Sequence, residues 1–453
     1  MPPLRLLTFS GLYPNAAQPN HGIFVENRLR HLVASGGANS TVVAPVPWFP
    51  SRDPRFGRWA QHARVPEEEV RHGLRVLHPR FPVIPRIGMS AAPWLLYRAM
   101  RPVLARLLAD GTGVDAIDAH YLYPDGVAAV WLGRRFGLPV VVTARGTDVN
   151  LIPRYRLPRR LIRAAIDGAS ALVAVSGALR DALLDLGAPP GKVTVLRNGV
   201  DTALFRPPVD REAARAALGV AGPTLVSVGG LIERKGHHRT IAAIASLPGT
   251  TLLIAGEGPD RPRLEAMIAG LGLGDRVRLL GAVPHHDLPA LYGAADASVL
   301  ASSREGWANV LLESMACGTP VVASPIWGNP EVVRVPAAGL IAPEITADAL
   351  AATIRRLLAA APDRRATRAF AEVMSWDETT AGQLALFRLV VGGSPRRARS
   401  ATEGHVSRGA RSSAASDAGL VASGVRRGAW GVGRSTRRLR RRPFDDRSGK
   451  SGV

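Results

Sequence analysis

The chain has 453 residues, of which 46% are hydrophobic and 21% charged, so it is long enough for two soluble domains with cores of their own. Its single cysteine, Cys317, excludes a disulfide within the chain and indicates a reducing compartment. The net charge of +22 is typical of nucleic-acid-binding proteins, but the last 60 residues carry 15 basic and 4 acidic residues and hold half of that excess.

The body of the chain is therefore only moderately basic, as in proteins that handle phosphates or touch an anionic membrane surface. The N-terminal stretch has one early arginine and a short apolar run, so we expect no signal peptide. Gly and Pro interrupt the longer uncharged stretches, so we expect no membrane-spanning helix. These features predict a cytoplasmic protein that can also lie on the inner face of the cell membrane.

The first half of the chain alternates apolar strands with helices, which is typical of a parallel sheet. Leu4–Ser10 is a predicted strand, a turn-rich loop follows it, and Ile23–Ala34 has the apolar spacing of a helix. This opening is Rossmann-like, although it lacks the dinucleotide pattern G-x-G-x-x-G. Further strands are predicted at Thr41–Val46, Leu74–Leu77, Asp115–Ala119, Val140–Thr143, Leu172–Ser176 and Val193–Leu196, helices at Pro93–Leu108 and Gly126–Phe136, and a loop over Pro47–Val70.

Two predicted strands end next to polar side chains. His120 follows Asp115–Ala119, and Arg145 and Asp148 follow Val140–Thr143. Ligands of open α/β sheets bind at the carboxyl ends of parallel strands, so we expect these residues to face a site. A histidine at such a position is also often structural, and that reading stays open for His120.

The second half begins with a strand at Leu225–Gly229 and continues into G-G-L-I-E-R-K-G. Arg234 and Lys235, before a glycine and a predicted helix start, place two cations beside free backbone N–H groups. That combination suits a departing diphosphate. More strands are predicted at Leu252–Glu257, Val277–Leu280, Val299–Ala301 and Pro320–Ala323, and helices at Val310–Ala316, Ala349–Ala361 and Glu378–Val391.

The stretch Ala294–Ser324 reads as strand, polar loop, helix, turn and strand, with Asn309 as the predicted N-cap of the helix. Glu305 lies in the loop and Glu313 lies inside the helix, eight positions later. A helix start at this edge of a sheet attracts a phosphate, and Glu313 can then accept hydrogen bonds from a neighbouring sugar hydroxyl.

The string S-S-R-E-G-W-A-N-V-L-L-E-S-M-A-C-G-T-P-V-V resembles the signature of retaining family 4 glycosyltransferases of the two-domain GT-B fold. The segment from Leu12 to Arg28 resembles a bacterial branch that assembles teichuronic acid and related cell-surface polysaccharides. The resemblance spans about residues 4–391 and implies a chain organised as follows. Residues 1–205 form an acceptor-side Rossmann-like domain, residues 206–374 a nucleotide-sugar-binding one, and residues 375–393 a helix that crosses back to the first domain. Beyond the resemblance, Gly, Ser, Ala and Arg dominate residues 394–453 without periodicity, so we predict a disordered Arg-rich tail there.

The resemblance also assigns roles to the site residues. It implies that Glu305 contacts the donor hexose, that Glu313 holds the nucleotide ribose, and that His120 approaches the anomeric carbon, so His120 and Glu305 are the candidate catalytic residues. It places Asp148 and Arg145 on the acceptor side. The candidate donor-binding residues are Gly22, Arg234, Lys235, Glu305, Gly306, Asn309, Val310 and Glu313. One position departs from the family pattern, because Gly230 stands where many members have arginine.

These features predict a hexosyltransferase that uses a nucleotide-diphosphate sugar, a UDP-sugar rather than a GDP-sugar, and a saccharide or polyprenyl-linked saccharide acceptor. No Asp-x-Asp pair occurs in the chain, so we expect activity without a metal or other cofactor. Arginines at Arg98, Arg101 and Arg106, and a second basic cluster from Arg154 to Arg163, fit an anionic membrane surface or an acceptor diphosphate, or are simply solvated.

Three other functions stay open at this point. A nucleotide-sugar 2-epimerase shares the fold, and a catalytically inactive subunit of a polysaccharide assembly complex would share the signature. The basic run Arg437–Arg442 would suit nucleic acid, although we do not expect nucleic acid as a partner.

Overall fold

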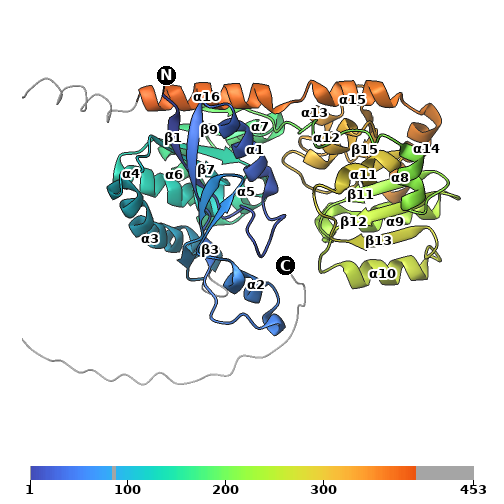
Figure 1. Ribbon diagram of the computed structural model, residues 1–453, viewed down its shortest axis with the longest axis horizontal. Coiled ribbons are helices and arrows are strands. Elements are labelled where there is room, and N and C mark those ends of the chain that lie inside the picture. The colour runs from blue at the N-terminus through green and yellow to red at the C-terminus, as the bar shows by residue number, and fades with distance from the viewer. Residues whose placement is uncertain (1, 84–87, 394–453) are drawn as a thin grey trace, which may run out of the picture. The chain divides into compact units, whose positions relative to one another are not determined.

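The computed structural model describes residues 2–83 and 88–393. The predicted disordered tail, residues 394–453, lies outside the described residues. Within them, two parallel sheets organise the chain, one built before residue 196 and one after residue 223 (Figure 1). We refer to the parts around these sheets as the first and the second domain.

The sheet of the first domain has eight strands in the order β10-β9-β8-β7-β1-β2-β5-β4. All neighbours are parallel except β4 and β5, which pair antiparallel at one edge. The strands are β1 (Leu4–Phe9), β2 (Ala38–Val43), β4 (Glu68–Arg71), β5 (Leu74–Leu77), β7 (Ala116–His120), β8 (Val140–Ala144), β9 (Ala171–Ala174) and β10 (Val193–Val195), while β3 (Val46–Pro47) and β6 (Arg80–Phe81) form a separate small pair.

Helices connect these strands and bury the sheet. They are α1 (Ile23–Ala34), α2 (Arg58–Arg64), α3 (Gly88–Ala109), α4 (Val127–Phe136), α5 (Thr147–Asn150), α6 (Arg156–Gly168) and α7 (Gly177–Asp185). The prediction of a loop over Pro47–Val70 was wrong, because this segment contains the end of β3, all of α2 and most of β4. The N-cap of α2 is Gly57, which has no side chain to cap the helix, so α2 lacks the usual start signal.

The sheet of the second domain is entirely parallel, with six strands in the order β13-β12-β11-β14-β15-β16. The strands are β11 (Thr224–Val228), β12 (Thr251–Ala255), β13 (Val277–Gly281), β14 (Ala297–Leu300), β15 (Val321–Ala323) and β16 (Gly339–Ile341). The helices are α8 (Arg211–Ala217), α9 (His237–Ala245), α10 (Arg261–Gly270), α11 (Leu288–Ala294), α12 (Asn309–Ala316), α13 (Asn329–Val332), α14 (Ala347–Ala360), α15 (Arg364–Glu372) and α16 (Trp376–Gly392).

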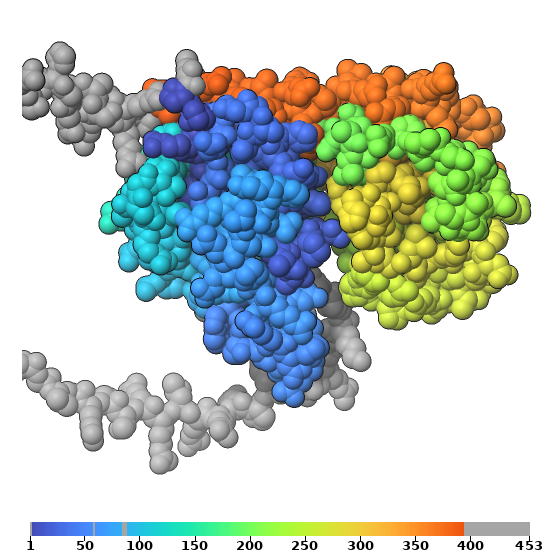
Figure 2. Space-filling model, viewed as in Figure 1, coloured from blue at the N-terminus to red at the C-terminus, as the bar shows by residue number. Residues whose placement is uncertain are grey.

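The last two helices run from one domain to the other, as the orange segment shows in Figures 1 and 2. Helix α15 packs against α12 of the second domain, and α16 packs against α1 of the first. Trp376 at the start of α16 stacks on His31 of α1, with ring centroids 5.4 Å apart. Phe387 and Val391 of α16 are buried in the same cluster as Leu4 of β1.

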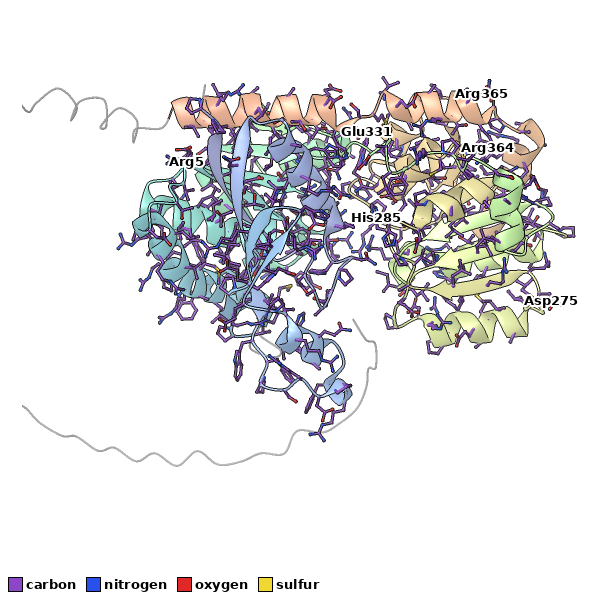
Figure 3. All side chains as sticks on the ribbon, in the orientation of Figure 1. Arg5, Asp275, His285, Glu331, Arg364 and Arg365 are labelled. Carbon is purple, nitrogen blue, oxygen red and sulfur yellow. The ribbon has the colours of Figure 1, made fainter. Side chains whose placement is uncertain are left out.

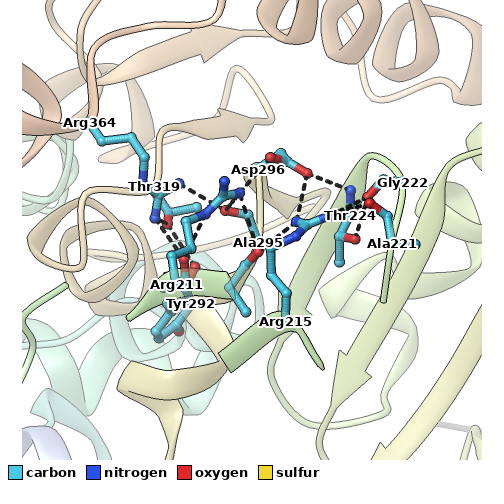
Figure 4. Close-up of polar contacts among 12 residues, drawn as sticks. Arg211, Arg215, Ala221, Gly222, Thr224, Tyr292, Ala295, Asp296, Thr319 and Arg364 are labelled. Atoms are coloured by element: carbon cyan, nitrogen blue, oxygen red, sulfur yellow. Dashed lines mark hydrogen bonds and ion pairs between the residues drawn. The ribbon is translucent and has the colours of Figure 1, made fainter. Parts of the chain in front are cut away.

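Arginines tie the second domain together from within (Figure 4). Arg211 and Arg215 of α8 both bind the Asp296 carboxylate, at 2.6 and 3.3 Å, and also the carbonyl oxygen of Ala294. Arg364 donates to the carbonyl oxygens of Gly293, Ala295 and Cys317. These guanidinium groups satisfy carbonyls at helix ends that would otherwise be orphaned. Among the described residues, no helix is long and apolar enough to cross a membrane.

Candidate active site

A cleft of about 680 Å³ is lined by loops of both domains. On the first domain its walls come from the loops after β1, β7 and β8, and on the second domain from those after β11, β12, β13 and β14. All of these loops follow the carboxyl ends of parallel strands, where open α/β sheets bind their ligands. The cleft is therefore the candidate active site, and its volume suits a small molecule.

One end of the cleft on the second domain is cationic. Lys235 Nζ lies 2.8 Å from Glu305 Oε1, and Arg234 Nη1 lies 3.4 Å from the same oxygen. Burial raises the pKa of Glu305, but the charges of Lys235 and Arg234 bring it below its usual range overall. The structure thus brings together three predicted site residues from two loops separated by about 70 residues of sequence.

Backbone from Val228 to Gly230 lines the cleft beside these cations. Gly230, the position that departs from the family pattern, adds no positive charge there. Arg304 and Arg145 also line the cleft and supply further cationic groups. The cleft thus has several cations without an arginine at position 230.

Glu313 lies on α12 and is held from two sides. His285 Nε2 lies 3.3 Å from Glu313 Oε1, and the Tyr292 hydroxyl donates to Glu313 Oε2 at 3.3 Å. Burial lowers the pKa of His285, but its hydrogen bond to Glu313 and the charge of that carboxylate raise it overall. His285 lies on the side of the second domain that faces the first (Figure 3). No sequence pattern predicts His285 and Tyr292 as site residues, because only their place beside Glu313 marks them.

The N-terminus of α12 differs from the prediction. Asn309 is the first residue of the helix and not its N-cap, which is Ala308 without a side-chain hydrogen bond. The Asn309 Oδ1 instead accepts from Asn198 Nδ2 of the first domain at 3.1 Å. Asn309 and Val310 nevertheless both line the cleft, so the helix start faces it.

Two glycines of the predicted set are explained by close approach of backbone. A Cβ on Gly306 would lie 1.9 Å from the Arg145 carbonyl oxygen, so only glycine lets this loop of the second domain touch the first. Gly22 has φ +70°, and a Cβ there would lie 2.4 Å from the Leu12 carbonyl carbon. Gly306 lines the cleft, whereas Gly22 sets the start of α1, whose residues Ile23 and Phe24 line it.

The structure places His120 differently from the expectation of a side chain facing the cleft. His120 is 1% exposed, its Nδ1 lies 2.7 Å from Arg145 Nη2, and its Nε2 lies 3.2 Å from Asp118 Oδ2. A guanidinium only donates, so Nδ1 is the acceptor and Nε2 carries the proton toward Asp118. Burial lowers the pKa of His120 to about 4, which keeps the ring neutral at pH 7.

Arg145 lies between this buried pair and the cleft. Besides His120 it donates to Asn198 Oδ1 at 3.2 Å, and its guanidinium stacks over the Phe24 ring at 5.1 Å from the centroid. A chain of contacts thus runs from Asp118 through His120, Arg145 and Asn198 to Asn309 at the start of α12. His120 positions Arg145 in this arrangement.

Asp148 is fully buried and binds backbone. Its carboxylate accepts from the N–H groups of Leu122, Arg145 and Gly146, at 2.7 to 3.2 Å. These contacts hold the loop after β8 against the turn after β7. Asp148 is 0% exposed, so neither of its carboxylate oxygens is free to contact an acceptor hydroxyl as the resemblance implied.

Glu331 of α13 joins the two domains. Its carboxylate accepts from the N–H groups of Gly177 and Ala178 at the start of α7, at 3.0 and 3.1 Å, and pairs with Arg197 at 2.6 Å. In Figure 3 it lies, like His285, beside the first domain. Within residues 2–83 and 88–393 no group of three or more His, Cys, Asp or Glu side chains is placed to hold a metal ion.

The arrangement of two Rossmann-like domains around a shared cleft is the GT-B fold of glycosyltransferases. A sucrose-phosphate synthase of Thermosynechococcus elongatus aligns with a TM-score of 0.71 and 23% identity, covering 86% of this chain and all of that one. Anabaena HepE, solved in complex with UDP, aligns with a TM-score of 0.63 and 23% identity over 84% of this chain and 98% of its own.

Sequence comparisons define the family. Residues 23–204 match the model of Glycosyltransferase Family 4, and residues 210–374 match that of Glycosyl transferases group 1. The chain belongs to this family of glycosyltransferases, as its sequence signature indicated. The Bacillus subtilis putative teichuronic acid biosynthesis glycosyltransferase TuaC is 29% identical over 359 residues, 78% of this chain and 89% of its own. A D-inositol 3-phosphate glycosyltransferase of Mycobacterium bovis is 32% identical over 304 residues, 61% of this chain and 62% of its own.

Proposed function

We propose that this glycosyltransferase moves a hexose from a UDP-sugar to a saccharide or polyprenyl-linked saccharide acceptor, with retention of anomeric configuration and without a metal ion. The observation that carries the proposal is the spacing of charge in the cleft. Arg234, Lys235 and the start of α12 can hold a diphosphate, Glu313 a ribose beside it, and Glu305 the hexose beyond it.

The leaving diphosphate gains negative charge as its bond to the sugar breaks. Arg234 and Lys235 can stabilise that charge directly, and the N–H groups at Asn309 and Val310 add the positive end of a helix. Carboxylates, which a metal ion would need as ligands at a diphosphate, are outnumbered by cations at this end of the cleft. This is the physical basis for proposing neutralisation by side chains.

Retention is proposed to occur by attack on the same face from which the diphosphate departs. The acceptor oxygen bonds to the anomeric carbon, the bond to the diphosphate oxygen breaks, and the acceptor proton passes to that oxygen. Both carboxylates of the signature already have partners, Glu305 with Lys235 and Glu313 with His285 and Tyr292. Such partners favour binding roles over a covalent nucleophile.

The choice of donor and pathway rests on relatives. HepE of Anabaena has been solved with UDP and with UDP-glucose, and TuaC is named for teichuronic acid biosynthesis. We propose by analogy that UDP is the nucleotide and that the product belongs to a bacterial cell-surface polysaccharide. The alternative of a 2-epimerase on this fold is not favoured by the family to which the chain belongs.

Thermal unfolding of the full chain with nucleoside diphosphates and nucleotide sugars, in EDTA, tests the donor. A ligand at 100 times its dissociation constant adds about 2.7 kcal/mol of stability, so UDP and one UDP-sugar should raise Tm clearly. The anomeric proton coupling of the purified product then reports retention or inversion. Stabilisation by UDP only after Mg²⁺ is added, or an inverted product, would refute the corresponding part of the proposal.

Association with an anionic membrane is a second part of the proposal. Helices α3 and α6 pack against each other, and their exposed arginines lie near exposed apolar side chains. Trp94, with Arg98 stacked 5.1 Å from its ring centroid, is 52% exposed, and Tyr155 and Leu157 are each 47% exposed. Aromatic rings beside arginines are the usual composition of a surface that lies at a lipid interface.

Sedimentation of the full chain with anionic and neutral liposomes tests this surface. Changing Arg98, Arg101 and Arg159 to glutamine should lower binding to anionic vesicles and its sensitivity to salt. The matched control changes three exposed arginines of the second domain: Arg355, Arg356 and Arg365. Equal loss in the two triple variants would mean that net charge, and not this surface, drives binding.

A further inference from the structure

A second cavity, of about 290 Å³, lies within the first domain beside the cleft. Its walls come mainly from the loops after β1, β2 and β7, at the carboxyl ends of parallel strands, and also from α2, β6 and α3. Leu12 and Tyr121 line both the cavity and the cleft, so the two share a wall. The cavity is not used by any step of the proposed transfer.

The charge of this cavity differs from that of the cleft. Among the described residues that line it there is no arginine or lysine, whereas Arg145, Arg234, Lys235 and Arg304 line the cleft. A phosphate or diphosphate is therefore attracted to the cleft and finds no permanent cation in the cavity. The cavity suits an uncharged group.

The walls combine apolar faces with a few polar groups. Val46, Phe81, Leu96 and Pro124 supply flat or branched apolar surface. Such surface covers the apolar face of a pyranose ring, while separate polar groups fix its hydroxyls. This mixture distinguishes a sugar site from a channel for a lipid chain, which would need no polar groups.

Asp125 is the polar group best placed for a hydroxyl. It is 4% exposed, and its Oδ2 accepts from the Gly11 N–H at 2.6 Å. This hydrogen bond uses only one of the two carboxyl oxygens of Asp125. Burial raises the pKa of Asp125 to about 7, so near neutral pH the carboxyl can either donate or accept a hydrogen bond.

Tyr13 also lines this cavity. It is 1% exposed, and its hydroxyl has no hydrogen-bond partner among the described residues. A buried hydroxyl without a partner is unfavourable, and a water or ligand hydroxyl within reach would satisfy it. Tyr13 and Asp125 come from different segments of the chain, one after β1 and the other after β7.

We propose that this cavity binds one uncharged sugar unit of the acceptor, next to the unit that receives the hexose in the cleft. The inference rests on the proposed transfer function and adds the chemical class of the acceptor's second unit. It implies an acceptor of at least two units, with any phosphate held on the cleft side. Its expected ligands are neutral pyranosides, and sugar phosphates are its expected non-ligands.

Saturation-transfer NMR on the full chain, with a panel of methyl hexopyranosides and hexose 6-phosphates, tests the assignment. UDP is kept saturating, so that the cleft on the donor side is filled. At least one neutral methyl glycoside should bind in the millimolar range, and the phosphates should bind less well. If only the phosphates bind, or no glycoside binds, the assignment of the cavity to a neutral sugar is wrong.

Two variants localise the binding. Val46→Phe fills the cavity, and Asp125→Asn keeps an acceptor for the Gly11 N–H while removing the ionisable group. Each should weaken glycoside binding about tenfold or more. The control variant Val70→Phe makes the same change in side-chain size at a residue that is 72% exposed. It should leave glycoside binding unchanged. Glycoside binding that survives Val46→Phe in a folded protein would overturn the proposal.

The same samples separate this proposal from the transfer function on which it rests. Stabilisation by UDP reports the donor side of the cleft and should be the same in wild type, Val46→Phe and Asp125→Asn. Loss of the UDP response in wild type would refute the donor proposal itself. An intact UDP response with no effect of Val46→Phe on glycoside binding would refute only the cavity.

Discussion

Glu305 should have opposite effects on the binding of UDP and of a UDP-sugar. In the structure its carboxylate is the partner of Lys235 at 2.8 Å and of Arg234 at 3.4 Å, the two cations proposed to hold the diphosphate. A diphosphate entering the cleft has to compete with this carboxylate for both cations. Glu305→Gln removes the competing charge, so UDP alone should bind more tightly to the variant.

The magnitude follows from the geometry of the pair. Two unit charges 4 Å apart attract by about 4 kcal/mol at an effective dielectric constant of about 20. The Lys235 and Glu305 side chains are 16% and 10% exposed, so desolvation offsets much of that attraction. A net gain of about 1–2 kcal/mol for UDP remains, which corresponds to an affinity about 5–30 times higher.

The contribution of the hexose to binding should change in the opposite direction and become weaker in Glu305→Gln. A charge-assisted hydrogen bond to a sugar hydroxyl contributes about 1.5–3 kcal/mol, and glutamine keeps only the weaker neutral bond. The ratio of the affinity for the UDP-sugar to the affinity for UDP should therefore be about tenfold lower in Glu305→Gln than in wild type. Titration calorimetry of both ligands against wild type and variant measures the two affinities separately.

The control for this prediction is Glu265→Gln, which removes the same charge from an exposed position on α10 that does not line the cleft. It should change neither affinity measurably, because solvent screens its charge. If Glu305→Gln weakens UDP and the UDP-sugar by the same factor, Glu305 only orients Lys235. The assignment of Glu305 to the hexose would then be wrong.

Three further predictions concern titratable side chains. Burial raises the pKa of Asp125 from 3.8 to about 7, so the free energy of unfolding of the wild type should fall by up to about 4 kcal/mol as the pH rises through this range. Urea unfolding at pH 5 and pH 8 should show that Asp125→Asn loses this pH dependence. Burial lowers the pKa values of His120 and His237 from 6.5 to about 4, so each should reduce the free energy of unfolding by up to about 3 kcal/mol as the pH falls from 6.5 to 4. In urea titrations, His120→Gln should show a weaker dependence of this free energy on pH. Glu331→Gln weakens the contacts with Arg197 and α7 and should cost about 1–2 kcal/mol in thermal unfolding, against at most about 0.5 kcal/mol for the exposed control Glu372→Gln.

Local pattern was enough to predict much of the fold. Helix Ile23–Ala34 and strand Leu74–Leu77 have in the structure the bounds that the sequence predicted. Both have regular apolar spacing and clear breaks at their ends, so local preference and burial agree. The strands of the second domain likewise lie within a few residues of their predicted positions, because each is a short apolar run that is buried.

The failures came from contacts that no local pattern contains. Asn309 looked like an N-cap because asparagine before an apolar run usually is one. Its side chain instead contacts Asn198, 111 residues earlier in the chain. His120 was expected to face the cleft from its place at the end of β7, yet Asp118 and Arg145 occupy both of its nitrogens. Asn198 and Arg145 reach these side chains through the packing of separate elements, whereas Asp118 lies only two residues before His120 on the same strand.

The basic composition of the chain is a weak indicator of function, because several of its arginines bind only other parts of the protein. Three arginines of the second domain donate their hydrogen bonds to carbonyl oxygens and to Asp296 of the same domain: Arg211, Arg215 and Arg364 (Figure 4). Arg28 is 1% exposed and donates to the Leu196 carbonyl oxygen, so it joins α1 to the end of β10. Arginine stays charged when buried and bonds several carbonyls at once, which makes it a structural crosslink here. The cations that bear on donor binding are therefore the few that line the cleft, and we expect their number near the proposed diphosphate, rather than the net charge, to determine how strongly the protein holds its donor.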